Sequence, residues 1–209
     1  MTAPEPAATF TRKEPRRRFL RLLIVPVLLL AVGFAVLRVG FKAYKLPAPS
    51  MQPTLEVGDR ILMKKGGYDP EVGDIVILHA PASVDDFSDP AEGCKGGKPA
   101  RRRACEVPDD GPRAEAAYVQ RIVAGPGDLL KLRDGRVTVN GVPERVTGLP
   151  ACQNDCTFQG FEVPAGHWFT LGDNRGNSSD GRYWGPLNRA AIDGPVVARY
   201  WPLERLGGV

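Results

Sequence analysis

"LLKLRDGRVTVNG" at residues 129–141 is the stretch that decides the fold class of this chain. Apolar and polar side chains alternate on both sides of Asp134-Gly135, and an Asp-Gly pair between alternating segments is the strongest short-range signal of a β-hairpin. Short apolar or β-branched runs predict further strands at 74–78, 118–124, 167–171 and 196–201. Because Gly/Pro-rich turns separate these runs, we predict a mainly β fold of the sandwich or barrel-like kind.

The N-terminal part of the chain has a different pattern. Residues 22–37 contain no charged or polar side chain, and six basic residues against two acidic ones precede residue 22. As a helix rising ~1.5 Å per residue, residues 19–41 would span about 34 Å, enough for a hydrocarbon core of roughly 30 Å. The positive-inside rule then predicts a cytoplasmic N-terminus at 1–18, a single transmembrane helix at 19–41 and an extracytoplasmic domain at 42–209. A cleaved signal peptide is the alternative, since it also begins with basic residues.

The charge and the cysteines agree with this topology. The formal net charge is +4, all of it in the N-terminal segment, so the predicted outer domain is neutral. A nucleic-acid-binding domain would carry a basic face, and we therefore expect no nucleic-acid partner. The four cysteines all lie in the predicted outer part, where an oxidising compartment favours disulfides. We favour the local pairs Cys94–Cys105 and Cys152–Cys156; a zinc site is the alternative, but no histidine stands at ligand spacing from either pair.

Residues 80–116 interrupt the β pattern. They are charged, rich in Gly and Pro and weakly apolar, and we predict an inserted surface loop. The basic run at 98–103 is either solvated or able to contact anionic lipid headgroups.

Four further stretches stand in order after the apolar segment: "PSMQPTLEVGD" (49–59), "GDIVIL" (73–78), "YVQRIVAGPGD" (118–128) and "GDNRGNSSDGRYWG" (172–185). Singly, their Gly and Asp residues indicate only tight turns. Together they closely resemble the bacterial type I signal peptidase family, over nearly all of 46–201 except the 80–116 segment. The resemblance implies a signal-peptidase-type β fold on a single transmembrane helix in the plasma membrane. It also implies cleavage of secretory preproteins after Ala-x-Ala-type sites. Membrane lipid would be in contact with the protein, and the reaction would use neither a metal nor another cofactor.

The resemblance assigns roles to particular residues. Ser50 matches the family's nucleophile, and the prolines beside it restrict its backbone, as suits a group held for attack. Pro49, Met51 and Tyr118 would contact a substrate that binds as an extended strand. Ser178 would hydrogen-bond and orient the base. A network of charged side chains would support the site from behind: Arg121, Asp173, Arg175, Asp180 and Arg182.

The sequence departs from the family at the catalytic base. The family has a lysine where this chain has Gln120, and a carboxamide nitrogen is not basic. The sequence therefore leaves three interpretations open. The protein is a peptidase in which another group acts as the base, with Lys64, Lys65, His79, Lys131 and His167 as candidates; or it is an impaired homologue or pseudoprotease that binds signal peptides; or it is an anchored β module that binds another partner.

Overall fold

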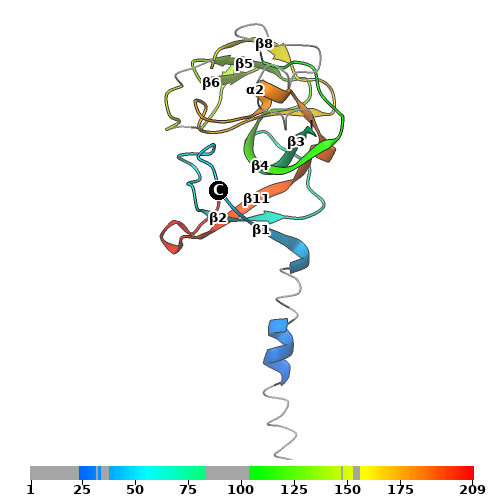
Figure 1. Cartoon of the computed structure of the whole chain (residues 1–209), viewed down its shortest axis with the longest axis vertical. Helices are drawn as coiled ribbons and strands as arrows, with labels where there is room; N and C mark the ends of the chain where they lie inside the picture. The colour runs from blue at the N-terminus through cyan, green and yellow to red at the C-terminus, as the bar shows by residue number, and fades with distance from the viewer. Residues whose placement is uncertain (1–23, 32, 34–37, 83–103, 147, 153–155) are drawn as a thin grey trace, which may run out of the picture. The chain divides into compact units, whose positions relative to one another are not determined.

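The computed structural model describes residues 24–31, 33, 38–82, 104–146, 148–152 and 156–209. The chain divides into two compact units, Met1–Gly40 and Phe41–Val209 (Figure 1). In the first unit, residues 24–31 and 38–40 are helical, and strand begins at Phe41. Within the described part of the chain, no helix combines the length and the apolar character that crossing a membrane requires. Much of the predicted transmembrane segment 19–41 lies outside the described residues, so that segment stays a prediction.

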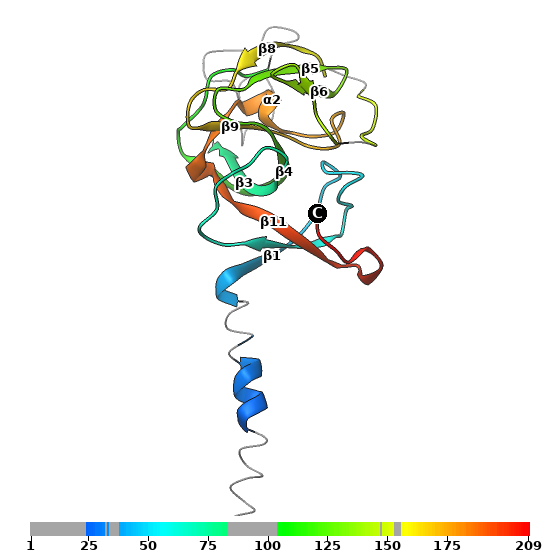
Figure 2. The same cartoon turned by 180° about the vertical axis from the view of Figure 1, so that it is seen from behind.

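The second unit is mainly β and holds two antiparallel sheets. The larger has seven strands in the order β1 (Phe41–Lys45), β2 (Arg60–Lys64), β11 (Ile192–Trp201), β3 (Ile75–Pro81), β4 (Arg113–Ala124), β9 (His167–Leu171) and β10 (Leu187–Asn188). The smaller has four, in the order β7 (Val142–Pro143), β6 (Arg136–Val139), β5 (Leu129–Arg133) and β8 (Phe158–Glu162). The short helices are α2 (Gly181–Trp184), η2 (Arg189–Ala191) and η3 (Leu203–Arg205). The smaller sheet lies at one end of the unit, and β1, β2 and β11 lie at the other (Figures 1 and 2).

The predicted hairpin is confirmed as β5 and β6. Asp134 and Gly135 both have positive φ, at 50° and 79°, as a two-residue turn matched to the twist of the strands requires. Leu130, Leu132 and Val137 turn inward and are almost fully buried. The alternation seen in the sequence is therefore the alternation between the core and solvent.

The predicted boundaries of the inserted loop were wrong at both ends. β3 continues to Pro81 and β4 begins at Arg113, and these two residues are register partners. The ladder extends this far because paired strands satisfy backbone N–H and C=O groups even where the side chains are charged and exposed. Residues 83–103, between the two strands, lie outside the described residues.

Residues 118–122 of strand β4 lie between two hydrophobic clusters, and this packing positions the site. Val119 packs against the cluster that contains Met51 and Leu55. Tyr118 and Ile122 belong to another cluster, which also contains Trp184. Because alternate residues of a strand point to opposite faces, Gln120 shares the face of Tyr118 and Ile122.

Candidate active site

Ser50 lies in the turn between β1 and β2, and its position is fixed by its neighbours. The residue is half-buried. Met51, which follows it, is fully buried, and the Leu55 N–H donates to the Met51 carbonyl at 3.0 Å. The Gln52 N–H donates to the Pro49 carbonyl at 3.1 Å, which closes the turn. Burial of Met51 thus anchors a loop whose serine remains partly exposed.

The segment after β9 holds this turn from the other side. The Asn174 backbone N–H donates to the Ser50 carbonyl at 2.9 Å, and the Asn174 side-chain amide donates to the Pro49 carbonyl at 3.1 Å. The Thr54 hydroxyl donates to the Asp173 carboxylate at 2.5 Å. Two stretches more than a hundred residues apart in sequence are therefore joined on both sides of Ser50.

Gly172 lets Ser178 and Ser50 come close together. A Cβ added to Gly172 would lie 2.2 Å from Ser178 Oγ and 2.5 Å from the Ser50 carbonyl oxygen. Both distances are below any real contact, so a side chain at 172 would push these two residues apart. Ser178 Oγ is buried and has no hydrogen-bond partner within the described structure.

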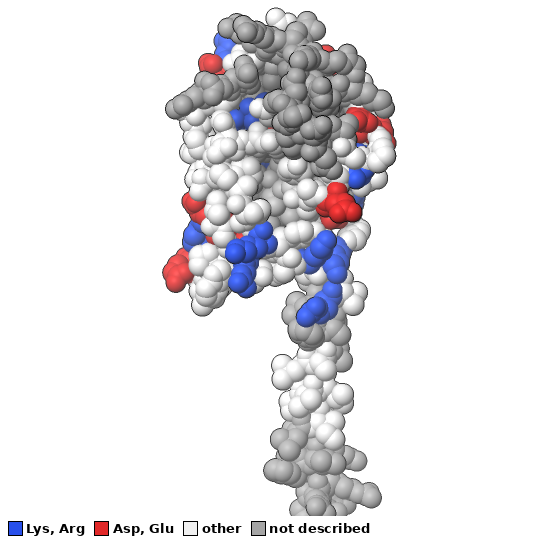
Figure 3. All heavy atoms as spheres, viewed as in Figure 1, with Lys and Arg blue, Asp and Glu red and all other residues white. Residues whose placement is uncertain are grey.

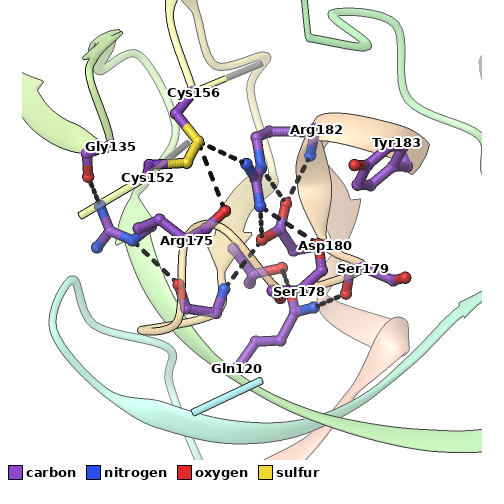
Figure 4. Close-up of polar contacts among 12 residues, drawn as sticks. Gln120, Gly135, Cys152, Cys156, Arg175, Ser178, Ser179, Asp180, Arg182 and Tyr183 are labelled. Atoms are coloured by element: carbon purple, nitrogen blue, oxygen red, sulfur yellow. Dashed lines mark hydrogen bonds and ion pairs between the residues drawn. A yellow bond between two sulfur atoms is a disulfide. The ribbon is translucent and has the colours of Figure 1, made fainter. Parts of the chain in front are cut away.

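Gln120 is 1% exposed, and both polar atoms of its amide are hydrogen-bonded. Its Nε2 donates to the Ser179 carbonyl at 2.5 Å, and its Oε1 accepts from the Thr170 hydroxyl at 2.6 Å. Figure 4 shows Gln120 reaching the turn that carries Ser178 and Ser179. The amide bonds the residue after Ser178 rather than Ser178 itself, the residue to which the family resemblance assigns the orienting of the base.

The predicted charge network is instead a set of separate ion pairs. Arg121 donates to both carboxylate oxygens of Asp173, at 2.9 and 2.7 Å. Arg182 does the same to Asp180, at 2.8 and 2.9 Å, and Asp180 also accepts the Gly172 N–H at 3.1 Å.

Arg175 has a partner that the sequence did not suggest. It pairs with Glu144 at 2.6 Å and donates to the Gly135 carbonyl of the β5–β6 turn at 2.7 Å. Short side-chain bonds therefore hold the 172–182 segment at three points.

The comparison with known proteins identifies the family. Residues 16–201 match the sequence profile described as signal peptidase, peptidase S26. This chain is a member of the signal peptidase family. It is 33% identical over 169 residues to signal peptidase I of Leptolyngbya laminosa, covering 79% of this chain and 71% of that protein. It is 35% identical over 164 residues to thylakoidal processing peptidase 1 of Arabidopsis thaliana, covering 77% of this chain and 42% of the relative.

A further sequence relative agrees. The chain is 30% identical over 208 residues to probable signal peptidase I-2 of Synechocystis, covering 95% of this chain and 82% of that protein. The crystal structure of a signal peptidase I from Enterococcus faecalis aligns with a TM-score of 0.38 at 23% identity, over 62% of this chain and 98% of the other.

The structure brings together most of the residues that the signal peptidase motifs indicated. Ser50 lies close to Ser178 beside Gly172, and Gln120 contacts the neighbour of Ser178. Pro49 is half-buried beside Ser50. Met51 is fully buried in the core, so its position supports packing rather than contact with a substrate. This is a correction to the predicted role of Met51.

Tyr118 is half-buried, and its ring centroid lies 5.1 Å from that of Trp184. The face of β4 that carries Gln120 is thus bordered by aromatic rings. Val76, directly opposite Gln120 on β3, adds a fully buried aliphatic side chain.

The candidate replacement bases are engaged or exposed elsewhere. His79 contacts Asp193 at 3.4 Å and the Ala114 carbonyl at 3.0 Å. His167 contacts Asp110 at 3.2 Å. The three lysines, Lys64, Lys65 and Lys131, are exposed.

The predicted disulfide Cys152–Cys156 is present, with Cα atoms 6.0 Å apart. It lies beside the ion pairs, where Arg182 Nη1 approaches Cys156 Sγ at 3.7 Å (Figure 4). The other predicted pair includes Cys94, which lies outside the described residues.

Sequence reasoning missed three residues that build the site. Gly172 stands in a quoted motif, but only the close approach of Ser50 and Ser178 shows why a side chain is excluded there. Thr170 gives no signal in the sequence, because its role depends on β9 pairing with β4. Asn174 also lies in the motif, and its two bonds to the Ser50 turn appear only in three dimensions.

Proposed function

We propose that this chain is a membrane-bound serine endopeptidase that recognises secretory preproteins and cleaves after Ala-x-Ala-type sites, slowly, because Gln120 replaces the base. Ser50 is the nucleophile. One observation carries this proposal: the Ser50 turn and Ser178 meet at Gly172, and the buried amide of Gln120 bonds the residue after Ser178. The relatives' names, signal peptidase I and thylakoidal processing peptidase, support the choice of substrate.

The chemistry explains why the proposed reaction is slow. Ser50 Oγ would attack the peptide carbonyl carbon, and the backbone N–H of Ser50 would donate to the oxygen that becomes negative. The proton on Ser50 Oγ needs an acceptor. Gln120 Nε2 is a donor, and Gln120 Oε1 is an amide oxygen that already accepts from Thr170. The proton would therefore pass to water without assistance from a base.

A second candidate function follows from the same amide. Both ends of Gln120 are hydrogen-bonded, so the buried glutamine carries no unpaired group that would disturb the site. This favours a protein that binds signal peptides and releases them uncut. In either case we propose that the peptide lies extended beside Pro49 and Tyr118, adding a strand to the exposed backbone there.

The proposed location is the plasma membrane, with residues 42–209 outside and membrane lipid in contact with the protein. Exposed basic side chains support contact with lipid headgroups: Arg60 and Lys64 share the outer face of β2, and Lys45 of β1 lies opposite Arg60. Figure 3 shows basic side chains gathered at the end of the second unit where β1 and β2 lie. Protease added to intact spheroplasts should degrade 42–209 and spare a short N-terminal fragment. Recovery of a soluble secreted form lacking residues 1–45 would refute the anchor.

Two assays separate the candidate functions. Purified protein is incubated with a preprotein, and cleavage is followed by gel electrophoresis and mass spectrometry. Slow cleavage at the Ala-x-Ala site that disappears in Ser50→Ala supports the peptidase. No cleavage, together with crosslinking to the intact preprotein from a photoreactive group at position 118, supports the binder. Neither cleavage nor crosslinking would contradict both.

A further inference from the structure

We infer that Thr170 is a positioning residue that fits the site to an amide and sets the basicity of any amine placed at residue 120. This inference rests on the proposed function, because it concerns the same site. Thr170 is fully buried on β9, and its hydroxyl donates to Gln120 Oε1 at 2.6 Å.

The register of the sheet makes this contact specific. Thr170 pairs with Ile122, two residues along β4 from Gln120. Diagonal neighbours of this kind are within reach of a long side chain on the same face. An amide oxygen buried here requires a donor, and Thr170 supplies one where a valine of the same shape would not.

The hydroxyl also fixes which way the amide points. With Oε1 bound to Thr170, Nε2 faces the Ser179 carbonyl, to which it donates at 2.5 Å. A reversed amide would place its NH₂ group against Thr170 and its oxygen against a carbonyl oxygen, which would repel it. Thr170 and Ser179 thus select one orientation of Gln120, and in that orientation neither end of the amide is directed to Ser178 Oγ.

The same hydroxyl would affect a lysine at this position. Thr170 Oγ1 can accept from an ammonium group, and a hydrogen bond to the charged form raises the pKa of an amine. The charged groups on the elements around Gln120 are compensated by their own partners: Arg121 with Asp173 and Arg182 with Asp180. Val76 opposite on β3 is apolar. Removal of the Thr170 hydroxyl should therefore lower the pKa of the amine.

The first experiment is a stability cycle that needs no activity. Thr170→Val in the full chain should lower the midpoint of thermal unfolding, because Gln120 Oε1 loses its donor inside the core. Thr170→Val combined with Gln120→Met should lose less than the two single changes together, since no polar group is left unpaired. Thr170→Ser, which keeps the hydroxyl, is the matched control and should retain most of the midpoint. Equal losses from Thr170→Val with and without Gln120→Met would overturn the pairing.

The second experiment is the pH dependence of kcat/KM in a Gln120→Lys background. Adding Thr170→Val should move the acidic limb to lower pH, because the amine loses a partner that favours its charged form. Thr170→Ser should leave the limb in place. An unmoved limb, or a shift to higher pH, would refute the effect on basicity. If Gln120→Lys shows no cleavage at any pH, the proposed peptidase function fails, and the stability cycle still decides whether Thr170 and Gln120 are paired.

Discussion

Replacing Gln120 with lysine is the most informative single change in this protein. The side chain at 120 is 1% exposed and is surrounded by Val76, Ile122 and Tyr118 on the same face of the sheet. Full burial lowers the pKa of an amine from its ordinary value of ~10.4, by up to about 3–5 pH units. The Ser179 carbonyl, which now accepts from Gln120, would accept from the ammonium and oppose part of this shift.

These opposing effects leave the pKa of the new amine below its ordinary value. Part of the amine is then neutral at pH 7 and can accept the Ser50 proton. General-base assistance is typically worth about 10²–10⁴ in rate. We therefore expect Gln120→Lys to raise kcat/KM by at least about 10² over the very low value of the unmodified protein.

The assay uses an internally quenched peptide with Ala-x-Ala before the scissile bond, in detergent micelles, and a preprotein as the second substrate. Gln120→Met, which is similar in length and cannot accept a proton, is the matched control and should stay at the low rate. The added activity should vanish when Ser50→Ala is combined with Gln120→Lys. It should also fall with decreasing pH, because protonation removes the neutral amine.

One result would refute this reasoning. If the unmodified protein cleaves at the rate of its Gln120→Lys variant, and Gln120→Met does not slow it, then residue 120 is not the base position. Single replacements of the alternative bases would then identify the group responsible: Lys64, Lys65, His79, Lys131 and His167.

Four other predictions concern the surroundings of the site. Gly172→Ala should abolish the activity gained with Gln120→Lys and should destabilise the fold by about 1–3 kcal/mol in denaturant titrations, as overpacking does. The control Gly208→Ala, at a position with no other atom within 4 Å of an added Cβ, should change neither the activity nor the stability. Ser178→Ala should not lower the unfolding midpoint of the unmodified protein, because the buried Ser178 Oγ has no partner. The same change should slow cleavage by the Gln120→Lys variant. A lowered midpoint in the unmodified protein would contradict this prediction. Cys152→Ser should cost no more than about 2 kcal/mol in urea unfolding, because the disulfide closes a very short loop, and a larger loss would show that the bridge holds more than its own loop. Burial, aided by a hydrogen bond to a carboxylate, raises the pKa of Tyr68, so the folded state keeps a proton that the unfolded state loses above about pH 10. The free energy of unfolding should therefore fall more steeply between pH 10 and 11.5 in the unmodified protein than in Tyr68→Phe. Identical slopes of this free energy against pH in the two proteins would refute the linkage.

The strands could be predicted where the sequence carried a local signal. The β5–β6 hairpin followed from alternation around Asp134-Gly135, and β9 was predicted with the correct ends at 167–171. The start of β4 was missed because Arg113 to Ala117 carry little β-branched or apolar signal, and pairing with β3 decides their conformation. Local propensity is weak evidence where a neighbouring strand supplies the hydrogen bonds.

The roles within the site were less predictable than its membership. Motif order indicated Ser50, Gln120 and Ser178 as site residues, and the structure places the two serines close together. The partners of the charged residues could not be predicted from their spacing in the sequence. Arg121 lies on β4 and Asp173 follows β9, so the two side chains meet only because these strands pair in the sheet. The burial of Met51 was likewise hidden, since a motif does not show which of its side chains turn toward the core.

The two buried hydroxyls near residue 120 differ in their hydrogen-bond partners. Thr170 is engaged by the amide, whereas Ser178 Oγ is left without a partner, and an unpaired buried hydroxyl costs about 1–3 kcal/mol. The Thr170 hydroxyl donates to the amide and would accept from an ammonium group, whereas Ser178 Oγ has no bond to the amide. The surroundings of residue 120 therefore hold one hydroxyl that the amide uses and another that it does not use. The activity of Gln120→Lys should depend on both hydroxyls in opposite directions: it should decrease when Ser178 is removed, and at acidic pH it should increase when Thr170 is replaced by valine.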